Sequence, residues 1–318
     1  MPQRLRKVIS KPTTLSLSIV VCLLALLGLI LPTGMRSLLI DIMIFSIFAM
    51  AYDILFGFSN QFSYGQALFF GVGAYGVLLP ILHMKVNLWT GMLIAEMLCL
   101  FFALALGSLA VRVSGAYFVI ITIIFNMIFY LLALDWTWLT GGDDGLSFAV
   151  PPIPLGFASF SVYDPIVNYY FTFFFFIITY LILKRIIDSP LGRILVSIRE
   201  NEERVRFLGY DVIRYKLIAY IISALFTGLS GALYAVRTRY ASAEYFSLAI
   251  SAEPIIWTLI GGAGTLIGPI IGAAIITSLI YYIGVWWKHY LIIIGTLMII
   301  LLRVSPKGIV GYIASKMR

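Results

Sequence analysis

Charged side chains are scarce in this sequence. Only 11% of its 318 residues are Asp, Glu, Lys or Arg, and 62% are hydrophobic, whereas a typical soluble domain carries about 25% charged residues. A folded soluble protein could not hide so much apolar surface, because its exterior must still present polar groups to water. The composition therefore excludes a soluble protein and predicts one that lies in a membrane.

Cysteines and nucleotide-binding motifs are also nearly absent. The only cysteines are Cys22 and Cys99, each inside an apolar run, which excludes a disulfide framework and favours packing roles over metal binding. The P-loop sequence G-x-x-x-x-G-K-[ST] does not occur. Residues 71–76 fit G-x-G-x-x-G, but no strand precedes them, so small-residue helix packing explains them better. We therefore expect no cofactor, no metal and no enzymatic activity.

Long apolar runs predict an all-α, polytopic membrane protein in which residues 1–318 form a single transmembrane domain. The runs are continuous and close to the roughly 20 residues that span a bilayer, without the alternation of barrel strands. The first run is too long for a signal-peptide core, and no cleavage site precedes Pro32, so we expect a retained helix. Ten spans are expected near 15–34, 38–56, 64–83, 89–111, 115–134, 166–184, 216–236, 249–262, 265–285 and 289–303.

Basic residues gather in three places. Sixteen of the 22 Lys and Arg residues lie at 4–11, 184–216 and 303–318, whereas the loop 135–164 holds four Asp and no Lys or Arg. Basic residues beside spans mark the cytoplasmic side, and the expected span count returns the chain there at each cluster. The charges predict cytoplasmic termini, a cytoplasmic segment 184–216 and an outer loop 135–164. Since no soluble domain with a basic face exists, membrane lipid is an expected partner and nucleic acid is not.

Two glycine-rich stretches, 57–76 and 249–285, interrupt the apolar pattern. The second is either two short spans or a discontinuous helix with a re-entrant half. Its glycines 264, 268 and 272 are spaced by four, which favours close helix packing. Paired broken segments also mark transport sites between internal repeats, where half-helix N-termini can face a substrate carboxylate. Both interpretations stay open at this stage.

The segment 184–216 carries eight basic and five acidic residues. Ser189 and Pro190 are suited to start a helix, and Gly209 is suited to end it, with a break near Asn201. Apolar residues recur at helical spacing, at Ile194, Ile198, Val205 and Leu208. The mixed charge favours docking of a soluble partner over an ordinary solvated loop or a helix lying on anionic lipid.

Four carboxylates fall within or at the rims of the expected spans: Asp41, Asp53, Glu96 and Glu253. A charge at the bilayer centre costs about 2.5–3.5 kcal/mol on insertion scales, so such residues usually face a protein interior or a cavity. Glu96 is the most central, whereas we expect Asp41 and Asp53 near the membrane interface. These carboxylates keep open a stand-alone ion- or proton-coupled carrier, while polar motifs at this depth argue against a purely structural scaffold.

Seven further sequence features stand out: FSYGQALFFGVGAY at 62–75, RVSGAYF at 112–118, LTGGDDGL at 139–146, SPLGR at 189–193, SIREN at 197–201, Gly209, and GGAGTLIGP at 261–269. Together they resemble one family, the permease subunits of branched-chain amino acid ABC importers, in particular the M-type subunit. The resemblance runs from about residue 55 to 310 in the family's order, and the joint occurrence of the blocks is specific although each alone is weak.

The resemblance implies a multi-pass protein of a bacterial or archaeal inner membrane that pairs with a second, related permease as a heterodimer. It also implies two cytoplasmic ABC ATPases as partners, and a periplasmic or lipid-anchored protein that delivers leucine, isoleucine or valine. Urea or short amides are the alternative substrates. The implied pathway residues are Ser63, Gly65, Gln66, Gly73, Glu96, Thr140, Gly141, Gly142, Gly145, Gly261, Gly262 and Gly264; the implied coupling residues are Ser189, Pro190, Gly192, Arg193, Arg199, Glu200, Asn201 and Gly209, with Arg193, Arg199 and Glu200 expected to contact the ATPase.

Overall fold

The computed structural model of the chain is almost entirely helical in the part that it describes. That part comprises residues 14–155, 158–286, 292, 295–296, 303 and 308–311. Helices dominate because each backbone N–H and C=O within hydrocarbon must be hydrogen-bonded by the protein itself. In chain order the elements are α2 (Thr14–Ile30), α3 (Thr33–Asp53), the π-helical turn η1 (Ile54–Phe58), α4 (Gln66–Met84), α5 (Leu88–Ala110), α6 (Ala116–Asp135), α7 (Thr137–Thr140), β1 (Leu146–Ser147), β2 (Ile153–Leu155), β3 (Ala158–Phe160), α8 (Pro165–Asp188), α9 (Pro190–Glu200), α10 (Glu202–Phe207), α11 (Val212–Thr238), β4 (Tyr240–Ala241), the short helix η2 (Ala243–Phe246), α12 (Leu248–Gly261) and α13 (Ile267–Trp286).

The expected polytopic, helical membrane protein is confirmed. Among the described residues, six helices are long and apolar enough to cross a membrane: α3 with η1, α4, α5, α6, α8 and α11. The shorter apolar helices include α12, α13 and part of α2. These nine helices correspond to the first nine predicted runs. The tenth predicted run, 289–303, lies almost entirely outside the described residues, as do the basic residues at both termini apart from Arg303.

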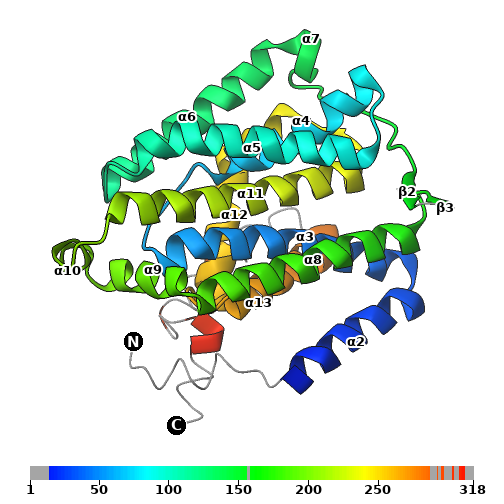
Figure 1. Ribbon diagram of the computed structural model, residues 1–318. Helices are drawn as coiled ribbons and strands as arrows, with labels where there is room; N and C mark the ends of the chain where they lie inside the picture. Colours follow the sequence, from blue (N-terminus) through cyan, green and yellow to red (C-terminus); the bar gives the residue numbers. More distant parts are fainter. Residues whose placement is uncertain are drawn as a thin grey trace.

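The long helices lie roughly parallel, so the bundle has two distinct ends (Figure 1). Helices α9 and α10 lie at one end, which we call the α9–α10 end. The opposite end carries α7 and an antiparallel ladder of β2 and β3, and we call it the β2–β3 end. The charged segment 184–216 and the acidic loop 135–164 therefore lie at opposite ends of the bundle, as their charges predict.

Glycines bring α4 and α11 into backbone contact. A Cβ atom added at Gly73 would fall on the carbonyl group of Gly228, and one added at Gly231 would fall on the carbonyl of Phe70. Small residues at helix interfaces allow this close approach, which maximises van der Waals contact in a bilayer. Helices α3 and α4 are the most buried of the long helices, whereas α5 and α6 expose most of their apolar surface.

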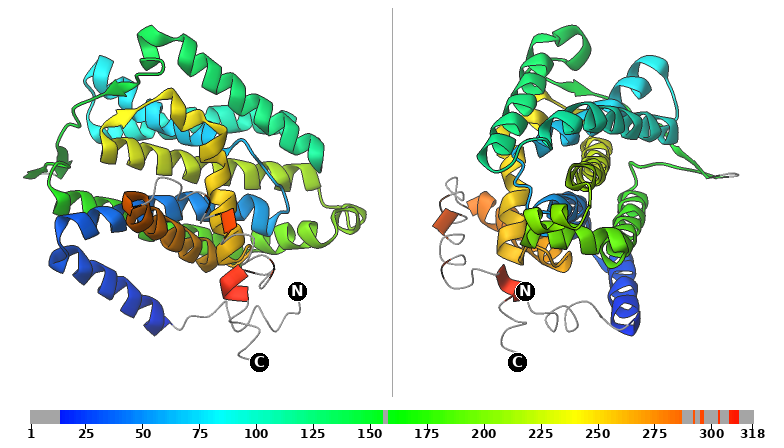
Figure 2. Two further views of the ribbon diagram at one scale, coloured as in Figure 1. Left: turned by 180° about the vertical axis from the view of Figure 1, so that it is seen from behind. Right: turned by 60° about the vertical axis from the view of Figure 1, so that its left-hand side comes forward.

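The chain between β4 and α13 crosses the bundle as a broken segment. At the β2–β3 side, Tyr240 and Ala241 pair with β1, and Phe246 in η2 accepts a hydrogen bond from Asn126 in the middle of α6 (2.7 Å). Helix α12 then runs across the direction of α3 and α11 (Figures 1 and 2). With 14 residues it is about 21 Å long. The run 249–285 thus forms two separate helices, α12 and α13, and whether α12 is a short span or a re-entrant half stays a prediction.

Helix α13 returns along α3 in the opposite direction. Its first residues lie beside the end of α3, where Leu266 donates a backbone hydrogen bond to Asp53 (3.2 Å). Near its other end, the hydroxyl of Tyr282 lies 3.3 Å from the sulfur of Met35 at the start of α3. Gly308, beyond the tenth predicted run, packs on the backbone of Gly262. The described residues on the two sides of that run therefore lie at opposite ends of the bundle.

Candidate functional site

The charged segment folds into two short helices, α9 and α10, at one end of the bundle (Figure 1). Pro190 lies in the first turn of α9, where its missing N–H costs nothing. Asn201 separates the two helices, and its side-chain oxygen accepts a hydrogen bond from the backbone N–H of Arg204 (2.8 Å). Gly209 adopts the left-handed conformation (φ 86°) directly after α10. The helix start, the break and the stop all agree with the sequence pattern.

One face of α9 and α10 is buried against the start of α11. Ile198, Val205 and Val212 form a small hydrophobic cluster there. Gly192 is buried too, and it packs so closely that a Cβ atom at this position would collide with the backbone of Ile187. The hydroxyl of Ser189 differs from its predicted capping role: it donates to the carbonyl of Ile186 (2.6 Å) and so closes α8 instead of opening α9.

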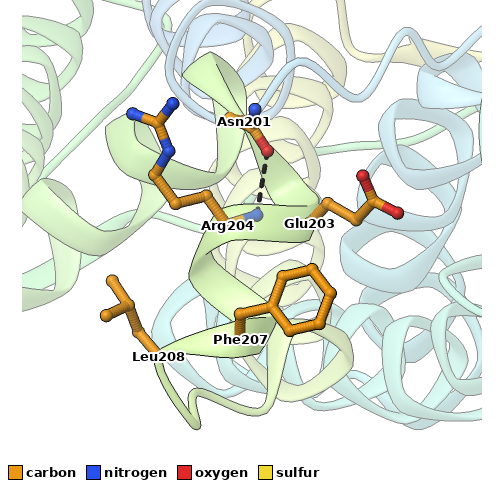
Figure 3. Close-up of a pocket in the computed structure, with 5 residues that line it drawn as sticks. All are labelled: Asn201, Glu203, Arg204, Phe207 and Leu208. Carbon is orange, nitrogen blue, oxygen red and sulfur yellow. Dashed lines mark hydrogen bonds between the residues drawn. The ribbon is translucent and has the colours of Figure 1, made fainter.

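The outer face of α10 exposes two large apolar side chains. Phe207 is 86% exposed and Leu208 is 70% exposed, and Figure 3 shows both at a surface pocket shared with Asn201, Glu203 and Arg204. The prediction that Leu208 belongs to the buried face is wrong, because α10 ends at Phe207 and the chain turns away at Leu208. Exposed aromatic surface within a charged region is typical of a partner site. Sequence reasoning missed Phe207.

The three residues expected to contact the ATPase point in different directions. Arg193 and Glu200 are exposed on α9. Arg199 is partly buried, and its guanidinium donates to the backbone carbonyl of Gly57 in η1 (2.5 Å). Arg199 therefore binds the membrane-embedded part of its own chain.

Asp53 lies at the centre of this contact region. That it lies near the membrane interface stays a prediction, but within the protein its side chain is completely buried. One carboxylate oxygen accepts from the backbone N–H of Gly264 (2.7 Å), and the other accepts from that of Leu266 (3.2 Å). Gly261 and Gly262 precede this loop, and a Cβ atom at Gly261 would fall on the carbonyl of Gly268. The glycine block 261–269 therefore forms a compact turn that is held by Asp53.

The predicted pathway residues of the first glycine-rich stretch are buried. Ser63, Gly65 and Gln66 have almost no exposed surface. The side-chain oxygen of Gln66 accepts a hydrogen bond from the hydroxyl of Thr227 in α11 (3.2 Å). A Cβ atom at Gly65 would lie 2.5 Å from the carbonyl oxygen of Thr122 in α6. These residues, like Gly73, join helices in this conformation of the chain, and their role in the pathway stays a prediction.

The third predicted group, Thr140 with the three glycines of 141–145, forms a turn at the β2–β3 end. The hydroxyl of Thr140 donates to the carbonyl of Ala133 (2.6 Å), and its own carbonyl accepts from the hydroxyl of Tyr75 (3.0 Å). All three glycines have φ between 59° and 77°, a region that other residues rarely adopt. The geometry of this group is that of a structural turn anchored on α4 and α6.

Glu96 lies midway along α5 and is partly exposed. Within the described residues, one oxygen of its carboxylate is buried without a hydrogen-bond partner. The guanidinium of Arg112, in the turn after α5, donates to the carbonyl of Ser108 in the last turn of that helix (3.0 Å), and in the part of the chain that the structure describes it forms no ion pair with Glu96. A carboxylate in this setting requires water, a proton or another chain.

A second charged group lies where α3, α11 and α12 meet, and sequence reasoning did not assemble it. Asp41 of α3 and Arg237 of α11 form an ion pair (3.6 Å) with 30% and 24% of their side chains exposed. The hydroxyl of Tyr234 lies within electrostatic range of both residues and of Glu253 on α12. Arg237 was missed because it follows a long apolar run and its partner is almost two hundred residues away. Partly exposed charges within spans usually face a cavity or another subunit.

Known permeases of branched-chain amino acid transport systems are similar to this chain over most of its length. The high-affinity branched-chain amino acid transport system permease protein LivM of Escherichia coli is 28% identical over 287 residues, which cover 84% of this chain and 68% of the relative. The protein of the same name from Salmonella typhimurium matches to the same extent. A probable branched-chain amino acid transport permease protein LivM of Methanocaldococcus jannaschii is 27% identical over 54% of this chain and 53% of the relative.

No solved structure matches the chain. A family model does match, over residues 34–302, and it describes the permease component of the branched-chain amino acid transport system. The match includes every long helix of the bundle and the charged helices α9 and α10. The chain therefore belongs to the family of permease components of branched-chain amino acid transport systems, and it is a transport subunit, not an enzyme.

Proposed function

We propose that this chain moves leucine, isoleucine or valine across the inner membrane as one of two paired permeases, driven by two ABC ATPases on the cytoplasmic side. In this proposal the α9–α10 end is the cytoplasmic end, both termini are cytoplasmic, and the chain crosses the membrane ten times. The position of the basic segment 184–216 at one end and the acidic loop 135–164 at the other supports this orientation. A periplasmic or lipid-anchored binding protein delivers substrate at the β2–β3 end.

The observation that carries the proposal is the pair of exposed apolar side chains on α10. Phe207 and Leu208 stand among charged residues at the end of a membrane bundle, where a soluble protein can bury them. The opposite charges of Glu203 and Arg204 beside them favour a protein surface over an anionic bilayer, which would attract a uniformly basic segment. The ATPase is the partner whose chemistry and location fit.

The partly exposed ion pair of Asp41 and Arg237, with Glu253, is our candidate for the lining of the central pathway. These charges are too exposed for a packed core and too polar for contact with lipid tails. The interface with the second permease accounts for both properties. A zwitterionic amino acid offers groups of both signs that such a lining can accommodate.

Reconstitution in proteoliposomes tests the function. The chain with the second permease, the ATPases and the binding protein should take up leucine only when ATP is present, and valine should compete with it. Uptake by this chain alone under an ion gradient would establish the stand-alone carrier instead. Competition by urea without competition by valine would move the substrate to the urea and amide class.

Replacing the exposed apolar pair tests the docking surface. Phe207→Ser with Leu208→Ser should abolish co-purification of the ATPases, while the chain itself remains folded because neither side chain is buried. Trp138→Ser is the matched control, since Trp138 is 79% exposed on α7 at the opposite end. Retention of the ATPases by the double variant would refute the assignment of this surface.

A further inference from the structure

A buried carboxylate ties the end of α3 to a loop that is 211 residues further along the chain. Asp53 is fully buried, and its two oxygens accept backbone N–H groups from Gly264 and Leu266. Because water cannot replace these bonds at a buried acceptor, losing them is costly. Because the loop 262–266 joins α12 to α13, Asp53 fixes the position of both helices relative to α3.

The next turn of the chain extends this connection to α9. Directly after Asp53, the helix widens into the π-helical turn η1, and π-helical turns occur frequently at functional sites. Gly57 in η1 accepts a hydrogen bond from the guanidinium of Arg199 (2.5 Å). A Cβ atom at Gly57 would collide with Asp53 and with the backbone N–H of Gly264, and one at Gly264 would lie 2.7 Å from the Arg199 guanidinium. Four residues from three distant segments therefore form one tightly packed contact, which we call the Asp53 node.

We propose that Asp53 and Arg199 are positioning residues that carry a displacement of α9 to the loop 262–266, and through it to α12. The inference rests on the proposed function, in which the ATPases move α9. Arg199 is the last basic residue of α9 and is directed inward, whereas Phe207 and Leu208 face outward. The segment thus has an outer surface for the ATPase and an inner contact with the membrane domain. Helix α12, which crosses the bundle beside α3, is the element that this contact moves.

The coupling between ATP hydrolysis and transport is the property to measure. In the fully reconstituted importer, Asp53→Asn replaces one acceptor oxygen by an NH2 group and removes the charge, while the side chain keeps its size. Arg199→Met removes the donor to Gly57 and keeps an apolar stem. Each variant should bind the ATPases and hydrolyse ATP at close to the native rate, but take up about tenfold less leucine per ATP, which matches the loss of charged hydrogen bonds.

Arg112→Met is the matched control. Arg112 follows α5 at the α9–α10 end, but its guanidinium donates to the carbonyl of Ser108, four residues earlier at the end of α5, a contact within one local segment. This variant should keep the native ratio of uptake to hydrolysis. If Asp53→Asn does not accumulate in the membrane, Arg199→Met decides the question, since it leaves the bonds between Asp53 and the loop in place. A native ratio in Arg199→Met would overturn the proposal.

A distance measurement separates this inference from the proposed function. Spin labels at Ser197 on α9 and Ala263 in the loop, both exposed, should give one narrow distance distribution in the native chain. Asp53→Asn and Arg199→Met should broaden it, and Arg112→Met should not. Failure of ATP-driven uptake in the native complex would refute the proposed function. Distributions that stay narrow in both node variants would refute the rigid connection, whatever the native complex transports.

Discussion

Replacing Gly73 by alanine tests whether the glycines of the first motif are packing residues. Gly73 lies in α4 against Gly228 in α11, and it is also among the residues that the family resemblance assigns to the pathway. An alanine Cβ would fall on the Gly228 carbonyl group, 2.6 Å from its carbon and 2.8 Å from the Gly228 Cα. Both neighbours are backbone atoms, so no side chain can rotate away to make room.

The cost follows from this geometry. The Gly228 carbonyl oxygen would lie 2.0 Å from the added Cβ, and a Cβ atom essentially never approaches another heavy atom within 3.0 Å, so α4 and α11 must separate by about 1 Å at this contact. Overpacking costs about 1–3 kcal/mol, and an overlap of this size puts the cost in the upper half of that range, while alanine recovers about 0.5–1 kcal/mol of helix propensity relative to glycine. The net loss in the free energy of unfolding should therefore be about 1–2.5 kcal/mol.

Unfolding in mixed micelles by titration with sodium dodecyl sulfate measures this loss. Gly91→Ala is the control: Gly91 is also a buried helical glycine, but the atoms nearest to its added Cβ, on Ile81 and on the backbone carbonyl of Val77, lie at 3.2 Å, so a shift of a few tenths of an ångström is enough. The control should be neutral or slightly stabilising. A Gly73→Ala variant as stable as the native chain, yet deficient in uptake, would refute the packing argument and return Gly73 to the pathway.

Three further substitutions have defined outcomes. Thr140→Val removes the hydroxyl that donates to Ala133 and should cost about 1–3 kcal/mol of stability, measured in the same micelle titration. Gly209→Ala forces a Cβ atom into the left-handed conformation at φ 86°, which costs about 1–2 kcal/mol and should weaken ATPase co-purification by shifting α10. Arg237→Met leaves Asp41 without its ionic partner; stability should fall by only about 1 kcal/mol because the pair is partly exposed, while leucine uptake should fall clearly if the pair lines the pathway.

Much of the fold could be predicted from the sequence because bilayer crossing imposes long apolar runs. The run 38–56 corresponds to α3 and η1, and 166–184 corresponds to α8. The direction of α12 could not be predicted from the run 249–262, because hydropathy reports how apolar a segment is, but not the direction in which it runs. Helix α12 is apolar because other helices surround it, and the chain before it crosses as a strand and a short helix.

The local features of the charged segment could be predicted equally well. Pro190, Asn201 and Gly209 act through their own backbone geometry, so their positions in the sequence were sufficient. The direction of Arg199 could not be inferred, because its acceptor on Gly57 is 142 residues away. Hydrophobic periodicity likewise placed Leu208 on the buried face, since it assumes that the helix continues to that residue.

The fold brings together several of the blocks that resemble the family. The glycine turn 261–269 and helix α9, which carries Arg199, belong to these blocks, and both meet the end of α3 at the Asp53 node. A buried carboxylate there would be costly unless its hydrogen bonds were satisfied, and the turn supplies them from its backbone, which any residue type could provide. The glycines are needed for a different reason: only they let three backbones come close enough for one aspartate and one arginine to join them. The substrate therefore need not touch these motifs for them to be essential to transport, and the partly exposed charges at Asp41, Arg237 and Glu253 are the better place to seek it.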